Sequence, residues 1–145
     1  MNTNSVFVYG TLMKGYSNHE KYLANYVVSR SQGLMAGELY HLNYGYPAAI
    51  DGSGVVKGEI FGLSDIEQAF TGLDYLEDFN QPDSENLYER QIREVQDSDG
   101  NIILCYVYLW ATGRIQDLIQ NGVHVNHGDW KEYVRKHKQT LEEDS

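Results

Sequence analysis

The stretch that decides the fold is Val6–Leu12, which reads VFVYGTL. Its first four residues alternate β-branched and aromatic side chains and stop at Gly10, a pattern typical of a strand that ends in a tight turn. A second glycine, Gly15, leads on to a predicted helix at Asn18–Ala24. Successive free backbone N–H groups in such a turn can bind an anion, although a tight connection is the simpler explanation of the glycines. Neither a Walker motif nor a GxGxxG pattern follows. If the turn binds a ligand, a small molecule with a carboxylate suits its backbone donors, because the protein is acidic.

Beyond this turn, strands and helices follow in an order typical of an α+β protein. Further strands are predicted at Leu34–Leu42, Ala48–Ile50, Val55–Leu63, Leu87–Val95 and Ile102–Trp110. One helix is predicted to begin after an N-cap at Ser64 and to run to about Asp78, and a closing helix to begin after Asp129. No crossover helix alternates regularly with the strands, so a doubly wound parallel sheet fits poorly. We expect one domain, residues 1–145, built as a small mixed or antiparallel β-barrel with two or three flanking helices.

The segment Ile102–Trp110 is apolar at every position. Both faces of such a strand are apolar, which predicts a central strand with one face in the core and the other under a helix or lining a cleft. The preceding connection, Asp97–Asn101, contains an Asp-Gly pair that indicates a hairpin.

The composition is that of a folded, acidic protein. The 145 residues include 21 acidic and 11 basic side chains, a formal charge of −10, with 41% hydrophobic and 22% charged residues. Because binding to phosphate backbones draws on clustered Lys and Arg, this balance argues against nucleic acid as the main partner. The single cysteine, Cys105, cannot form an internal disulfide, and neither a secretory signal nor a membrane-spanning apolar run is visible. We expect a cytoplasmic protein that binds a small molecule and no membrane; its oligomeric state stays open, and a monomer is compatible with the sequence.

The most informative single residue is Glu77. Ile66, Phe70 and Leu73 are spaced by four and three, the rhythm of a buried helical stripe, and the next position of that stripe is Glu77. A carboxylate there must be paired, hydrogen-bonded or protonated. Two interpretations stay open. Either the helix frays after Leu73 and Glu77 reaches solvent, or Glu77 points from the helix end into a cleft, where burial raises its pKa towards the range useful for proton transfer.

Two other constellations have simpler explanations than catalysis. Cys105 alternates with apolar residues, which favours a buried core thiol over a nucleophile. His124, His127 and Asp129 match no zinc-ligand spacing, and a helix cap explains Asp129 better.

Four ordered motifs, with a closing one, resemble the γ-glutamylcyclotransferase-like family. They are Val6–Leu12 followed by Gly15 and Asn18-His19, Tyr46–Ala48, Gly58–Phe61, Leu73–Glu77 with Tyr88–Arg90 downstream, and the closing Gly128–Trp130 with Tyr133. The closing motif is similar to that of bacterial members, and the resemblance covers most of the chain. At one position the chain departs from the family pattern, because Asp78 follows Glu77 where the family usually has glycine.

The resemblance implies a small mixed α+β barrel and assigns roles to particular residues. Glu77 matches the catalytic acid/base of the family, and Tyr88 matches a tyrosine beside the active cleft. The loop whose backbone holds the α-amino-acid end of a γ-glutamyl group is matched by Tyr9, Gly10, Thr11 and Leu12. No metal ion and no organic cofactor are implied.

The reaction that the resemblance implies is an intramolecular ring closure, of the transferase or lyase type. The α-amine of a γ-glutamyl donor attacks its own side-chain carbonyl, which yields 5-oxoproline and releases an amine or amino acid. Two alternatives stay open: a non-catalytic protein of the same fold that binds a γ-glutamyl or similar small molecule, and a related amide hydrolase or acyltransferase. The sequence leaves the identity of the leaving group open.

Overall fold

The computed structural model describes residues 3–10, 12–42, 47–76 and 88–136. Of the predicted site residues, Thr11 and Glu77 lie outside the described residues, as does the predicted loop 80–86.

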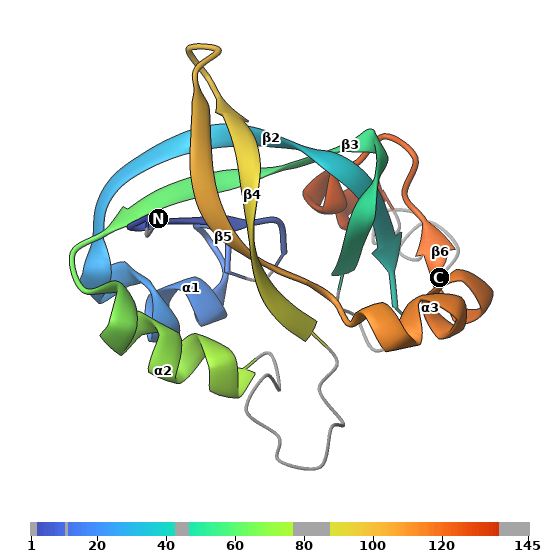
Figure 1. Ribbon diagram of the computed structural model, residues 1–145, viewed down its shortest axis with the longest axis horizontal. Coiled ribbons are helices and arrows are strands. Elements are labelled where there is room, and N and C mark those ends of the chain that lie inside the picture. The colour runs from blue at the N-terminus through green and yellow to red at the C-terminus, as the bar shows by residue number, and fades with distance from the viewer. Residues whose placement is uncertain (1–2, 11, 43–46, 77–87, 137–145) are drawn as a thin grey trace.

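A closed barrel forms the body of the protein (Figure 1). Its described strands are β1 Ser5–Val8, β2 Val27–His41, β3 Pro47–Leu63, β4 Tyr88–Asp97 and β5 Ile102–Trp110, with a short β6 at Val123–His124. The ring runs β3-β1-β5-β4-β2 and closes where β2 pairs with β3, while β6 extends the sheet beside β2. The described pairs are antiparallel except β1 and β5, which run parallel. The predicted small mixed β-barrel is confirmed.

The described helices lie outside the barrel (Figure 1). They are α1 Ser17–Tyr22, the 3₁₀ turns η1 Ala24–Tyr26 and η2 Thr112–Arg114, α2 Ile66–Leu76, α3 Ile115–Asn121 and a last helical segment, 130–136. The last segment begins as predicted, because a carboxylate oxygen of Asp129 accepts the N–H of Glu132 at 3.2 Å. The helix α3 was not predicted. None of the described helices is long and apolar enough to cross a membrane.

The cap of α2 differs from the prediction. We expected Ser64 as the N-cap, but Oδ1 of Asp65 accepts the N–H of Gln68 at 3.2 Å. The backbone N–H of Ser64 donates instead to the carbonyl of Tyr26 at 2.8 Å. Because this bond ties Ser64 to the preceding turn, the helix begins one residue later than expected.

Two strands are longer than predicted. β2 begins at Val27. β3 begins at Pro47 and continues through residues 51–54, for which no strand was predicted. The two strands pair with two register shifts, and the second shift, between Ala36 and Glu38, leaves residues 51–54 of β3 without a partner on β2. Oε2 of Glu38 accepts the N–H of Gly54 at 2.6 Å, so a side chain bonds the backbone of this irregular stretch where strand pairing does not.

β5 supplies the centre of the core. Cys105 and Val107 are fully buried, while the ring of Tyr106 on the opposite face meets Phe70 of α2 edge-on, with ring centroids 4.8 Å apart. The prediction that one face lies in the core and the other under a helix is confirmed. Burial also raises the pKa of Cys105 to about 12, so its thiol stays protonated at neutral pH and is no thiolate nucleophile.

The burial of α2 can be tested at Leu73, which is 0% exposed. Leu73→Ala is expected to lower the free energy of unfolding by about 2–5 kcal/mol, because the removed methyl groups leave a cavity. Leu104, 40% exposed, is the matched control, and Leu104→Ala is expected to cost less than about 1 kcal/mol. Urea denaturation followed by circular dichroism measures both. Equal losses for the two variants would contradict the packing of α2 on the barrel.

Candidate functional site

The chain turns as soon as β1 ends at Val8. The carbonyl of Gly10 accepts the N–H of Met13 at 3.0 Å, and the carbonyl of Met13 accepts the N–H of Tyr16 at 3.3 Å. Gly15, inside the second of these turns, has a φ of 104°, in the left-handed region that favours glycine. Two successive turns therefore carry the chain from the end of β1 to α1.

Gly10 lies against the start of β3. A Cβ atom at Gly10 would lie 2.4 Å from Cγ of Pro47, closer than side-chain atoms approach one another. The hydroxyl of Tyr88 donates to the carbonyl of Pro47 at 2.8 Å, and its ring meets that of Trp110 edge-on, with centroids 5.4 Å apart. Pro47 thus joins the turn after β1 to the first residue of β4.

Tyr9 and Leu12, which flank the glycine turn, are anchored in the core. The hydroxyl of Tyr9 donates to the carbonyl of Tyr108 at 2.5 Å. The carbonyl of Leu12 accepts a hydrogen bond of 2.9 Å from Nδ1 of His19, so this nitrogen carries a proton. The ring of His19 packs on Phe61, with centroids 4.9 Å apart. These contacts fix both ends of the turn.

The described members of the predicted site lie around this turn and the neighbouring starts of β3 and β4. They are Tyr9, Gly10, Leu12 and Tyr88. Within the described part of the chain, the N–H groups of Gly10 and Leu12 donate to no acceptor. Backbone donors in this condition are available to an anion.

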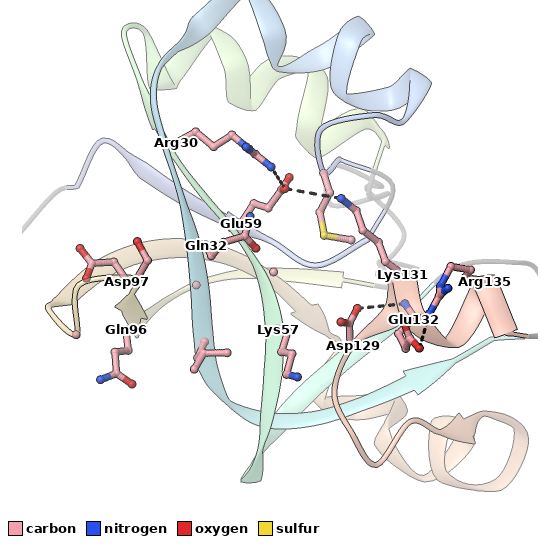
Figure 2. Close-up of a pocket in the computed structure, with 16 residues that line it drawn as sticks. Arg30, Gln32, Lys57, Glu59, Gln96, Asp97, Asp129, Lys131, Glu132 and Arg135 are labelled. Atoms are coloured by element: carbon pink, nitrogen blue, oxygen red, sulfur yellow. Dashed lines mark hydrogen bonds and ion pairs between the residues drawn. The ribbon is translucent and has the colours of Figure 1, made fainter.

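A buried glutamate beside the turn was not predicted as a site residue. Glu59 of β3 is 2% exposed. Its Oε1 accepts the N–H of Lys14 at 2.7 Å, and its Oε2 bonds Nη2 of Arg30 at 2.5 Å and lies 3.7 Å from Nζ of Lys131 (Figure 2). Burial alone would raise the pKa of Glu59, but the hydrogen bonds from Arg30 and the Lys14 N–H, with the charge of Lys131, hold this pKa below its ordinary value. Glu59 is therefore ionised at neutral pH.

A groove of about 660 Å³ lies beside Glu59, on the face of β2 and β3 that the last helical segment covers (Figure 2). Its cationic lining comes from Arg30, Lys57, Lys131 and Arg135. Of the turn after β1, Met13 lines the groove, whereas Gly10 and Leu12 do not. The groove is therefore distinct from the predicted site, and Glu59 contacts both the groove and the turn.

The side chains of the three residues weighed as metal ligands each bond a different partner. Nε2 of His124 lies 3.0 Å from Oε1 of Glu38, and Nδ1 of His127 accepts the N–H of Asp129 at 3.2 Å. Across the described ranges, no three or more His, Cys, Asp or Glu side chains are grouped so that they could hold a metal ion.

Solved structures share this barrel. An AIG2-like protein from Mus musculus matches with a TM-score of 0.58 and 28% identity, over 77% of this chain and 80% of that one. YkqA from Bacillus subtilis matches with a TM-score of 0.68 and 27% identity over 96% of this chain. The match covers 43% of YkqA, so the present chain spans less than half the length of that protein. The barrel with its glycine turn thus has the fold of AIG2-like proteins.

Residues 6–132 match the model of the family described as gamma-glutamyl cyclotransferase, AIG2-like, and the chain belongs to this family. The gamma-L-glutamyl-butirosin B gamma-glutamyl cyclotransferase of Niallia circulans is 31% identical over 141 residues, which cover 96% of this chain and 83% of that protein. The family predicted from the sequence motifs is confirmed, and so is the enzyme class, a γ-glutamyl cyclotransferase.

The close approach at Gly10 can be tested by adding a methyl group. Gly10→Ala is expected to lower the free energy of unfolding by about 1–3 kcal/mol, because the new side chain would overlap Pro47. Gly113→Ala is the matched control, since nothing lies within 4 Å of a Cβ at that position, and it is expected to be neutral or slightly stabilising. Thermal and urea denaturation measure both variants. Wild-type stability in Gly10→Ala would contradict the contact.

Glu59 is expected to make stability depend on pH. A carboxyl whose pKa is lower in the folded than in the unfolded state stabilises the fold above its unfolded pKa, and that contribution is lost as the pH falls through the folded pKa. With the ordinary value at 4.5, the loss is expected below about pH 4.5. The measurement is the free energy of unfolding of wild type minus that of Glu59→Gln across this range. The difference should be constant near neutral pH and decrease in acid; a constant difference throughout would show that the pKa of Glu59 is not lowered.

Proposed function

We propose that this chain converts a γ-glutamyl amine or γ-glutamyl amino acid into 5-oxoproline and a free amine. Glu77 is the proposed general acid/base, and Tyr88 is proposed to lie beside the bound substrate. The α-amino-acid end of the substrate is proposed to bind at Tyr9, Gly10, Thr11 and Leu12. The Niallia circulans relative is named for a γ-glutamyl-butirosin substrate, which supports a γ-glutamyl conjugate as the substrate here.

The observation that carries the proposal is the turn after β1. The N–H groups of Gly10 and Leu12 find no acceptor in the described part of the chain, and Gly10 packs on Pro47, to which Tyr88 is hydrogen-bonded. Backbone donors suit the α-carboxylate of a γ-glutamyl group, because they attract an anion without a cationic side chain. A binding site made of backbone N–H groups therefore suits a protein with a net charge of −10, in which cationic side chains are few.

The direction of α2 supports Glu77 as the acid/base. The helix begins directly after β3, whose end pairs with the start of β1, with Gly62 opposite Ser5. Further along, Phe70 packs on Tyr106 of β5. Cζ of Arg90, in β4, lies 4.0 Å from the centroid of the Phe70 ring. Tyr106 lies at the middle of β5, and Arg90 lies near the beginning of β4, opposite Tyr108 of β5. The helix therefore runs from the start of β1 towards the end of the barrel at which the turn lies.

Glu77 directly follows Leu76, the last described residue of α2. Since consecutive Cα atoms are only about 3.8 Å apart, the end of α2 limits where this carboxylate can act. Glu59 is the described carboxylate that contacts the turn, but Arg30 holds it in its ionised form. A group held in one protonation state is unsuited to giving and taking protons, which favours Glu77.

The proposed reaction needs one group that takes and gives protons, because two protons leave the α-nitrogen. Glu77 takes a proton from the α-ammonium, and the freed amine attacks the γ-carbonyl carbon of the same molecule. The new C–N bond closes the five-membered ring, and Glu77 gives its proton to the leaving nitrogen, so that the bond from the γ-carbon to this nitrogen breaks. The ring nitrogen then loses a second proton to Glu77, which passes it to the departing amine, so that 5-oxoproline with a neutral ring nitrogen and the ammonium form of the amine result. Because the nucleophile and the electrophile are tethered, the main task of the binding site is to hold the folded conformer.

A panel of γ-glutamyl peptides and γ-glutamyl amines tests the proposed function, with the products identified by mass spectrometry. Ring closure yields 5-oxoproline from at least one compound, which is the expected result. A hydrolase would release glutamate, and a non-catalytic binding protein would leave every compound unchanged. Either of these outcomes across the panel would overturn the proposal.

The role of Glu77 is tested by Glu77→Gln, in which the amide cannot accept the proton. The variant is expected to keep the wild-type fold and to lose about 10²–10⁴ in kcat. Asp78→Asn is the matched control, because it removes the same charge at the neighbouring position, and it is expected to keep most of the activity. Steady-state kinetics measure the loss, and circular dichroism checks the fold. Ring closure at the wild-type rate in Glu77→Gln would remove Glu77 from its role.

A further inference from the structure

One cluster of charges holds the backbone of Lys14 from both sides. Oε1 of Glu59 accepts the N–H of Lys14 at 2.7 Å, and Nζ of Lys131 donates to the carbonyl of Lys14 at 3.4 Å. The same Nζ lies 3.7 Å from Oε2 of Glu59, which Nη2 of Arg30 also bonds (Figure 2). Arg30, Glu59 and Lys131 together are called the Glu59 clamp. The clamp joins β2, β3 and the last helical segment at one point of the turn after β1.

We propose that Glu59 is a positioning residue, which fixes the turn Gly10–Gly15 in the shape that receives the substrate. The inference rests on the proposed function, because it assumes that this turn binds the γ-glutamyl group. The carboxylate of Glu59 bonds Lys14 and leaves the N–H groups of Gly10 and Leu12 to the ligand. Glu59 therefore acts on the substrate through the turn.

The strand register explains how Glu59 reaches the turn. Glu59 pairs with Val8, the last residue of β1, and with Gln32 of β2. Its side chain therefore stands where β1 ends and the turn begins. It shares the groove-lining face of the barrel with Arg30 and is covered by Lys131 (Figure 2).

A buried ion pair such as the Glu59 clamp is expected to add little to the free energy of unfolding. This favours a role in fixing the geometry of the turn. Moving a carboxylate out of water costs several kcal/mol, and apolar side chains of similar volume are often equally or more stabilising at such positions. An apolar side chain, however, cannot accept the N–H of Lys14. A backbone N–H bonded to a charged acceptor makes a shorter and stronger hydrogen bond than one bonded to a neutral acceptor. The ionised Glu59 therefore gives this N–H one defined position.

A looser turn should weaken the binding of substrate and of transition state alike. Such a loss raises KM and leaves kcat nearly unchanged, whereas loss of a group that acts on the reacting atoms lowers kcat. The split between KM and kcat therefore distinguishes a positioning residue from a catalytic one.

Glu59→Gln keeps the size of the side chain and removes its charge. With the γ-glutamyl compound that the wild type converts best, we expect KM to rise about tenfold and kcat to stay within about twofold. Glu38→Gln is the matched control. Like Glu59, Glu38 accepts a backbone N–H, that of Gly54 at 2.6 Å, and its carboxylate also contacts a second side chain, that of His124. Glu38 lies six residues beyond Gln32 along β2, roughly 20 Å at the rise of a strand, and this change is expected to leave KM unaltered.

Variants at Arg30 give a second test should Glu59→Gln fail to fold. Arg30→Gln removes the cation on Oε2 and is expected to raise KM about threefold, and Arg30→Lys should restore KM because it returns the charge. An unaltered KM in both Glu59→Gln and Arg30→Gln would overturn the inference. So would an equal rise in Glu38→Gln, since this would indicate a general effect of lost stability.

Hydrogen exchange of the Lys14 amide separates the failure of this inference from the failure of the proposed function. The Lys14 N–H is expected to exchange about tenfold faster in Glu59→Gln than in the wild type, while the amides of β5 exchange as before. This measurement needs no substrate. If the wild type converts no γ-glutamyl compound, the proposed function fails and the exchange rate still decides whether the clamp holds the turn. Unchanged exchange at Lys14 overturns the clamp even in an active enzyme.

Discussion

The pairing of β1 with two neighbours determines where the other parts of the site lie. β1 has four residues, Ser5–Val8, and lies antiparallel to β3 and parallel to β5. Because parallel strands end at the same edge, the turn that follows β1 emerges at the edge where β5 ends in Trp110. The antiparallel pairing of β5 with β4 brings Tyr88 to that edge as well. The turn after β1, which a short local pattern in the sequence predicts, therefore lies beside the end of β5 and the beginning of β4.

The elements that could be predicted are those whose pattern is local. The strand Ile102–Trp110 has the predicted bounds, because its apolar run follows directly on an Asp-Gly turn. The cap at Asp129 was predicted because the carboxylate and the N–H that it accepts are three residues apart. The prediction of an N-cap at Ser64 was wrong because the contact that decides it is not local. The backbone of Ser64 bonds Tyr26, far away in the sequence, so Asp65 caps the helix instead and the helix begins at Ile66.

The same distinction applies to the site. The turn Tyr9–Leu12 was visible in the sequence because its glycine and the strand before it are adjacent. Glu59 was visible as part of a family motif, but its contacts were not, since Arg30 comes from β2 and Lys131 from the last helical segment. The pairing of β2 with β3 brings Arg30 to the carboxylate, and the packing of the last helical segment beside β3 brings Lys131 to it. A charged residue inside an otherwise buried strand is the signal that could have marked Glu59.

The proposed roles of Glu59, a buried carboxylate on the groove side of β3, and of Glu77 make opposite demands on the two side chains. Holding the turn requires that Glu59 stays ionised, because a protonated acid would lose the charge-assisted bond to Lys14. Arg30 and Lys131 meet this requirement by lowering its pKa. Proton transfer requires the reverse, a carboxyl that gains and loses a proton near the working pH, which neighbouring cations oppose. The cations around Glu59 therefore suit its proposed role in holding the turn. The proposed acid/base, Glu77, instead belongs to a part of the sequence that is rich in Asp and Glu.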